Sequence, residues 1–165
     1  MAEVIGTLLE GACLRMPWYT DLRVVFDVLG GRERDFDWLV TDLECNCRPP
    51  ELRPPSDAWF FRGEALSDLV RREADPVQFE WAVLTGFHRG TVIDTENLRV
   101  VPYADGNPDF WRGQPRIQHP DACVEIVCWD STSVLLITTQ SELTARFRAG
   151  FPEAVDLADF NRRRR

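Results

Sequence analysis

Apolar and polar residues alternate along several stretches of this chain, and such alternation predicts β-strands. The clearest case is residues 77–87, where every odd-numbered position from Val77 to Val83 is apolar. Further strands are predicted at residues 36–45, 58–63, 122–130 and 133–139. A tight turn at Asp130-Ser131-Thr132 connects the last two, so we expect them to form an antiparallel hairpin.

Apolar residues three to four positions apart predict helices between the strands. These helices are expected at residues 2–14, 20–31, 64–73 and 139–150, with a short closing segment at 151–165. Thr20 is the expected cap of the second helix, and residues 139–142 have the spacing of a capping box that opens the fourth.

Strands and helices that mix without strict βαβ alternation predict an α+β fold. We expect a mostly antiparallel sheet with helices packed on one face. A chain of 165 residues fits one domain. The predicted domain covers residues 1–161, and residues 162–165 form an Arg tail.

The charge of the chain restricts its partners. It carries 27 acidic and 19 basic residues, for a net charge of −8, and every basic residue is Arg. An acidic surface of this kind repels nucleic acid and anionic membranes and attracts basic proteins. We therefore expect a basic protein partner, and neither nucleic acid nor membrane binding.

The cysteines favour buried thiols over a redox site, and a scaffold stabilised by a metal at Cys45 and Cys47 is only a weak alternative. The chain has five cysteines, at positions 13, 45, 47, 123 and 128, and no C-x-x-C pair. Cys123 and Cys128 are expected on opposite faces of one strand. No cofactor is expected either, since the chain has neither G-x-x-x-x-G-K nor G-x-G-x-x-G. An odd cysteine count and an N-terminal stretch unlike a secretion signal predict a cytoplasmic protein with reduced thiols.

Two regions combine carboxylates with large aromatic residues, a composition typical of binding surfaces. The first region lies along the strand at 36–45, whose acids are expected on an accessible edge. The second region is the loop at 102–111. The partner-binding candidates are Asp35, Asp37, Asp42, Glu44, Asp105, Asp109 and Trp111. The aromatic residues of the loop could equally anchor it to the core.

A small-molecule site or an enzyme is the alternative to a protein-binding surface. Its pocket would be formed by the loop at 102–120, with His88 or His119 as the proton-transfer group. No G-x-S-x-G or similar nucleophile motif accompanies either histidine. We therefore name no catalytic residues and favour a non-enzymatic function.

Several segments resemble a family of small uncharacterised cytosolic bacterial proteins. They are "DFDWLVTDLECN", "QFEWAVLTGF", "PYADGNPDFW", "IQHP", "EIVCWDSTSVLLI" and "FRAGFPEAVDLADFN", which together span most of the chain. Members of this kind are regarded as candidate immunity proteins of polymorphic toxin systems. The resemblance implies an inhibitor that covers the active surface of a basic toxin, and it supplies no catalytic residues.

Overall fold

The alternating stretches form a seven-stranded sheet in the computed structural model, which describes residues 3–11, 13, 15–16, 20–72 and 77–164. The strand order is β3-β2-β4-β5-β6-β1-β7, and every neighbouring pair is antiparallel. The strands are β1 (Ile5–Glu10), β2 (Phe36–Cys45), β3 (Ala58–Arg62), β4 (Phe79–His88), β5 (Val124–Trp129), β6 (Ser133–Thr138) and β7 (Val155–Asp156). The predicted α+β class is confirmed.

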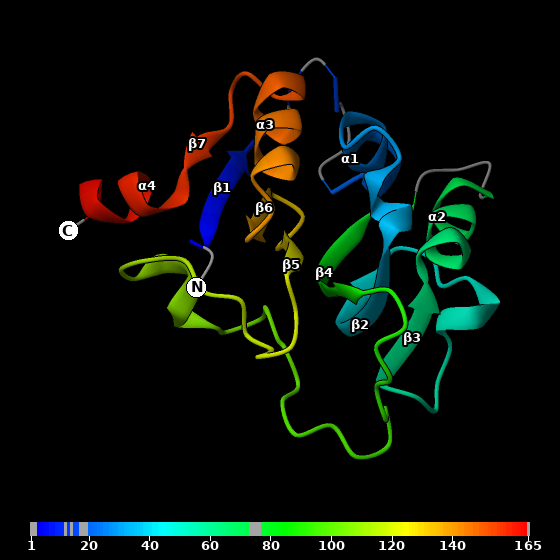
Figure 1. The fold of residues 1–165 in the computed structure, drawn as a ribbon. Coiled ribbons are helices and arrows are strands. Elements are labelled where there is room, and N and C mark those ends of the chain that lie inside the picture. The colour runs from blue at the N-terminus through cyan, green and yellow to red at the C-terminus, as the bar shows by residue number, and fades with distance from the viewer. Residues whose placement is uncertain (1–2, 12, 14, 17–19, 73–76, 165) are drawn as a thin grey trace.

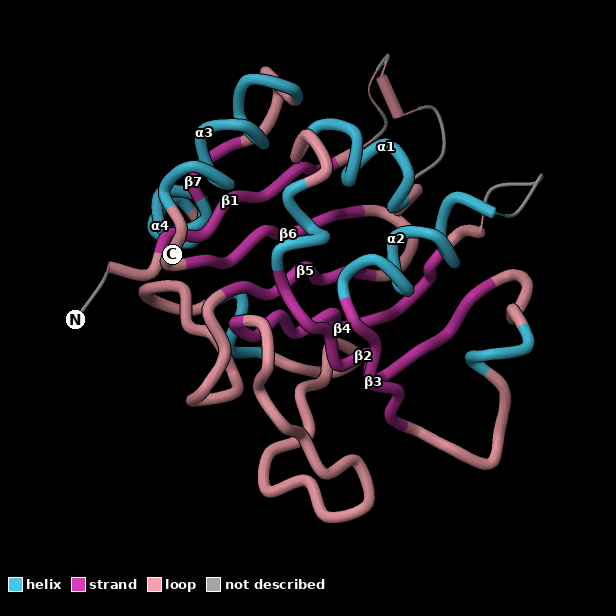
Figure 2. The backbone as a smooth tube through the Cα atoms, turned by 45° about the vertical axis from the view of Figure 1, so that its right-hand side comes forward, coloured by secondary structure: helices cyan, strands magenta, loops and turns pink. Residues whose placement is uncertain are grey.

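Three helices cover one face of the sheet, as Figures 1 and 2 show. They are α1 (Leu22–Val28), α2 (Gly63–Arg72) and α3 (Ser141–Gly150). Their apolar sides form the larger core with Trp38 and Val40 of β2 and Ile126 of β5. Trp38 is 1% exposed, and its indole N–H donates to the carbonyl of Glu33, 2.8 Å away. This indole bond places η1 (Arg32–Asp35) over the start of β2.

The opposite face is covered mainly by the long segment between β4 and β5, residues 89–123, which we call the covering loop (Figure 2). Its only described helical turn is η3 (Pro108–Trp111), in agreement with the proline-rich sequence. Ala104 and Phe110 pack from this loop against Val83, Val127 and other residues of a smaller core. Leu157, the first residue of α4 (Leu157–Arg163), joins the same core.

Residues 2–14 do not form the predicted helix. Residues 5–10 are strand β1, while residues 2, 12 and 14 lie outside the described part of the chain. Leu8 packs into the smaller core and Leu9 into the larger one. Because both faces of this strand are buried, its sequence lacks the alternation that would have identified it.

Two further local predictions are corrected. Asp21, and not Thr20, caps α1, accepting the N–H of Arg23 at 3.0 Å. Cys123 and Cys128 lie in the same core, because Cys123 precedes the regular part of β5.

The predicted hairpin between β5 and β6 is confirmed, with Asp130 and Ser131 at positive φ in its turn. Arg162 and Arg163 of the predicted tail belong to α4, and residue 165 lies outside the described part.

Candidate functional site

A β-bulge near the end of β2 brings the two candidate regions together. The pairing of β2 with β4 shifts between Thr41 and Glu44, where Asp42 has a left-handed φ of 51°. The shift reverses the alternation, so Leu43 enters the larger core and Glu44 stands opposite Trp81. The Asp42 carboxylate accepts the N–H groups of Ala104 and Asp105, at 2.6 and 2.8 Å. The acidic end of β2 therefore holds the covering loop directly.

Other contacts attach the covering loop along its length. The Thr41 hydroxyl donates to the carbonyl of Pro102 at 2.6 Å, and the Asn161 amide of α4 donates to the carbonyl of Phe110 at 3.0 Å. Pro115 lies against Gly6 of β1, where a Cβ would come within 2.5 Å of the proline ring. These contacts hold residues 102–115 of the loop against β1, β2 and α4.

Between the end of β2 and the covering loop lies a hollow of about 350 Å³, which we call the acidic hollow. Its charged lining residues are three carboxylates and one arginine, and Trp59 and Tyr103 add aromatic surface. The complete lining is Asp42, Leu43, Glu44, Arg48, Asp57, Trp59, Val101, Pro102 and Tyr103. The Arg48 guanidinium donates to the carbonyl of Leu43 at 2.7 Å. The hollow thus presents net negative charge beside apolar surface.

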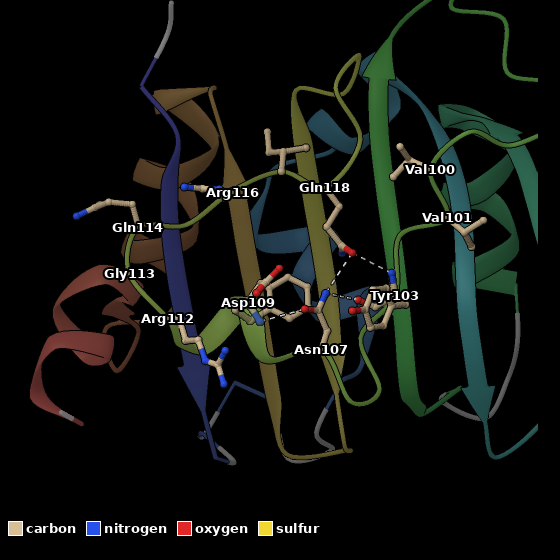
Figure 3. A pocket seen from close by; sticks show the side chains of 12 residues that line it. Val100, Val101, Tyr103, Asn107, Asp109, Arg112, Gly113, Gln114, Arg116 and Gln118 are labelled. Atoms are coloured by element: carbon tan, nitrogen blue, oxygen red, sulfur yellow. Dashed lines mark hydrogen bonds between the residues drawn. The ribbon is translucent and has the colours of Figure 1, made fainter.

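A larger hollow of about 530 Å³, the loop pocket, opens on the other side of Tyr103 (Figure 3). It is lined by Val100, Val101, Tyr103, Asn107, Asp109, Phe110, Arg112, Gly113, Gln114, Arg116, Ile117 and Gln118. Val101 and Tyr103 line both hollows and are 55% and 45% exposed. They form an exposed apolar ridge between an acidic hollow and a pocket that carries two arginines.

An amide network forms the floor of the loop pocket, and Figure 3 shows its hydrogen bonds. Gln118 Oε1 accepts the N–H of Tyr103 at 3.1 Å and the amide of Asn107 at 3.2 Å. Asn107 Oδ1 in turn accepts the N–H of Asp109 at 3.0 Å. The backbone N–H of Gln118 donates to the carboxyl of Glu125, 2.9 Å away, on strand β5. The pocket is therefore connected to a carboxyl group buried beneath it.

Glu125 is fully buried in the centre of the sheet, where the sequence analysis did not place a functional group. Burial raises the pKa of this carboxyl from 4.5 to about 8, and hydrogen bonds from Gln118 oppose the shift by a smaller amount. Its second oxygen is buried without a hydrogen-bond partner among the described atoms. One charged residue within the apolar run "VEIVCW" was the signal in the sequence that could have identified it.

Asp35 and Asp37 lie at the other end of β2, where Asp37 is about 23 Å from Glu44 along the strand. Asp37 is 1% exposed and thus does not lie on an accessible edge. Its carboxylate pairs with Arg62 of β3 and accepts the N–H of Gly90 at 2.9 Å. Asp35 is exposed and pairs with Arg32 at 2.8 Å. The structure therefore separates this pair from Asp42, Glu44 and Asp105.

Neither histidine lines the loop pocket. His119 is 8% exposed, stacks edge-on against Phe87, and accepts the N–H of Asp121 at Nδ1. His88 is exposed at the end of β4 and faces Phe36 in the strand register. The loop does line a pocket, and its polar groups include Asp109, Gln118, Asn107 and the two arginines instead of a histidine.

No metal centre is found among the described residues, since no three His, Cys, Asp or Glu side chains gather in a suitable arrangement. Burial raises the pKa of the Cys45 and Cys128 thiols, and that of Cys123 to about 11. These three thiols therefore remain protonated and weakly nucleophilic at neutral pH. No helix within the described ranges has the length and apolar composition needed to cross a membrane.

Comparisons of this chain with protein-family models, with curated proteins and with solved structures give no match.

Proposed function

We propose that this protein is a non-enzymatic binding protein that recognises a basic protein through the acidic hollow and the Val101–Tyr103 ridge. The observation that carries the proposal is the pair of hydrogen bonds from the covering loop to Asp42. They bring the acidic end of β2 and the aromatic loop, which are far apart in the sequence, onto one surface.

The composition of this surface fits a protein partner. Exposed carboxylates steer a basic protein toward it, and the exposed Tyr103 ring supplies the kind of residue that anchors interfaces. A standard footprint covers about 800 Å² per partner, which is roughly a tenth of the 8551 Å² surface of this chain. A footprint centred on the acidic hollow extends from Glu44 and Asp57 across the ridge to Asp105 and Asp109.

The resemblance to candidate immunity proteins suggests the biological form of this function. The partner would be a basic toxin domain, and binding would cover its active surface without any chemical step. A negatively charged inhibitor associates rapidly with such a target, and the association rate falls as salt screens the charges.

Co-expression tests this proposal. The gene directly upstream in the source genome would be expressed alone and together with this chain in a bacterial host. We expect toxicity from the first product alone and growth when both are present. A non-toxic product of housekeeping function, or toxicity that this chain does not relieve, would contradict the inhibitor role.

Charge reversal at Glu44 is expected to weaken that complex by at least about 30-fold, because loss of a buried interfacial charge pair costs about 2–5 kcal/mol. Glu44→Arg would be compared with Glu153→Arg, which makes the same charge change at an exposed position outside both hollows. Affinity would be measured by titration calorimetry at low and high salt. Equal losses of affinity in the two variants would show that binding depends on the net charge of the protein and not on the position of Glu44.

The loop pocket supports a second candidate function, the binding of a small anionic ligand. Arg112 and Arg116 line it, both are exposed, and neither forms an ion pair within the described residues. We expect citrate or inorganic phosphate to raise the unfolding temperature of wild type and Arg99→Gln, but not of Arg112→Gln. Arg99 is exposed on the same loop and does not line the pocket. An equal response of all three proteins would eliminate this candidate.

A further inference from the structure

Four half-buried aromatic side chains form a row on the face of the sheet that carries the covering loop. Trp81 of β4 contacts Trp129 of β5 with ring centroids 4.9 Å apart, and Trp129 contacts Trp111 of η3 at 4.8 Å. Trp111 then contacts Phe160 of α4 at 6.1 Å. The rings come from four different elements, so the row exists only in the folded protein.

The row begins at the acidic hollow. Trp81 stands directly opposite Glu44 in the register of β2 and β4, and Glu44 lines that hollow. The aromatic surface therefore extends the proposed partner-binding face toward the C-terminus of the chain.

Arg164 of the chain itself contacts the rings at the far end of this row. The Arg164 guanidinium lies over the Phe160 ring at 5.3 Å and over the Trp111 ring at 6.0 Å. Tryptophan is the strongest partner for such a cation, because its π-system presents a negative face. The guanidinium is planar and stacks on aromatic rings, which a lysine ammonium does not do.

A hollow of about 350 Å³, the aromatic hollow, opens beside this contact. It is lined by Glu10, Trp111, Trp129, Thr132, Ser133 and Arg164. Glu10 is exposed at the end of β1, and no ion pair involves it among the residues described. An aromatic wall, a carboxylate and two hydroxyl side chains together provide the chemistry that recognises a guanidinium group.

We propose that the aromatic hollow binds an arginine side chain of a basic protein partner, and that Arg164 covers the Trp111 wall of this hollow in the free protein. The identity of the partner rests on the proposed function, whereas guanidinium binding does not. Arg164 then has a defined role. It covers the tryptophan surface until a partner arginine displaces it, and it lowers the affinity for cations that compete for the same rings.

The test compares two arginines that carry the same charge. Arg164→Ala removes the guanidinium over Trp111, while Arg163→Ala removes the charge of its exposed neighbour, for which the structure records no ring contact. Octa-arginine and octalysine peptides would be titrated into wild type and both variants, with tryptophan fluorescence as the signal. We expect Arg164→Ala to bind octa-arginine about two- to fivefold more tightly than Arg163→Ala, equivalent to about 0.5–1 kcal/mol. The affinity for octalysine should rise by the same amount in both variants, relative to wild type.

A second variant tests the aromatic wall. Trp111→Leu keeps an apolar side chain and removes the π face, so it is expected to abolish the preference for octa-arginine over octalysine. Circular dichroism would confirm that the variant is folded. Equal octa-arginine affinity of Arg164→Ala and Arg163→Ala would overturn the proposal. So would an advantage of Arg164→Ala over Arg163→Ala that is as large for octalysine as for octa-arginine.

This experiment is independent of the inhibitor role. If the two arginine variants bind octa-arginine equally while binding of the upstream product still depends on Glu44, only the guanidinium site is wrong. If the two variants differ as expected and no toxin is neutralised, the site stands and the inhibitor role fails.

Discussion

Between about pH 4.5 and about pH 8, the free energy of unfolding is expected to fall as the pH rises, because of Glu125. The folded protein holds a proton on this buried carboxyl up to a pKa of about 8, whereas the unfolded chain releases it near 4.5. Where the folded state binds more protons than the unfolded state, higher pH favours unfolding. At about 1.4 kcal/mol per pKa unit, the full loss is at most about 5 kcal/mol.

Urea unfolding of wild type and Glu125→Gln at about pH 5 and about pH 9 would measure this effect. The neutral amide has no proton to lose, so the variant should lose much less stability than wild type between the two values. Glu80→Gln, which removes an exposed carboxylate from strand β4, serves as the control and should retain the wild-type dependence. Parallel pH curves for wild type and Glu125→Gln would show that Glu125 is already ionised in the fold.

The ionisation of Glu125 also bears on the loop pocket. Its carboxyl accepts the N–H of Gln118, whose side chain holds Tyr103 and Asn107 in the pocket floor. A charge at this position is buried directly beneath that floor. Ligand binding to the pocket is therefore expected to change over the same pH range as stability.

Replacement of Asp42 by alanine is expected to lower the free energy of unfolding by about 3–5 kcal/mol. The carboxylate accepts two loop N–H groups, and hydrogen bonds to a charged group contribute about 1.5–3 kcal/mol each. Alanine also adds about 1–2 kcal/mol of strain at the left-handed backbone of position 42. These costs are not fully additive, because the loop relaxes when its anchor is lost.

Asp42→Asn is the matched control for this prediction. Asparagine tolerates the left-handed conformation, and its side-chain oxygen can accept both N–H groups, since both reach the same atom of Asp42. We expect a loss of about 1–2 kcal/mol for asparagine, in urea unfolding followed by circular dichroism. Proteolysis of the covering loop should become faster only in the alanine variant. If alanine and asparagine cost the same, the hydrogen bonds to Asp42 do not hold the loop.

The comparison also separates two roles of Asp42. If asparagine retains the fold and partner affinity, Asp42 positions the binding surface. If it retains the fold but loses affinity, its charge contacts the partner, as the sequence analysis suggested.

Most of the local structure of this protein could be predicted from its amino-acid sequence. The alternation around Trp81, the tight turn at Asp130 and the apolar spacing of α2 and α3 identified their elements correctly, because each signal lies within about ten neighbouring residues. The sequence also indicated that carboxylates and aromatic residues at the end of β2 and in the covering loop form surfaces of interest. It failed at β1, where burial on both faces removes the periodic signal.

Which of these residues lie together depends on the packing of the whole chain. The bulge at Asp42 reversed the direction of Leu43 and Glu44, and no local pattern encodes such a reversal. Asp37 became a buried partner of Arg62, while Glu125 came to lie under the loop pocket. The hollows, the aromatic row and the raised pKa of Glu125 all arise from contacts between segments distant in the chain. Such contacts depend on how the sheet and its covering loop pack, which a one-dimensional pattern does not specify.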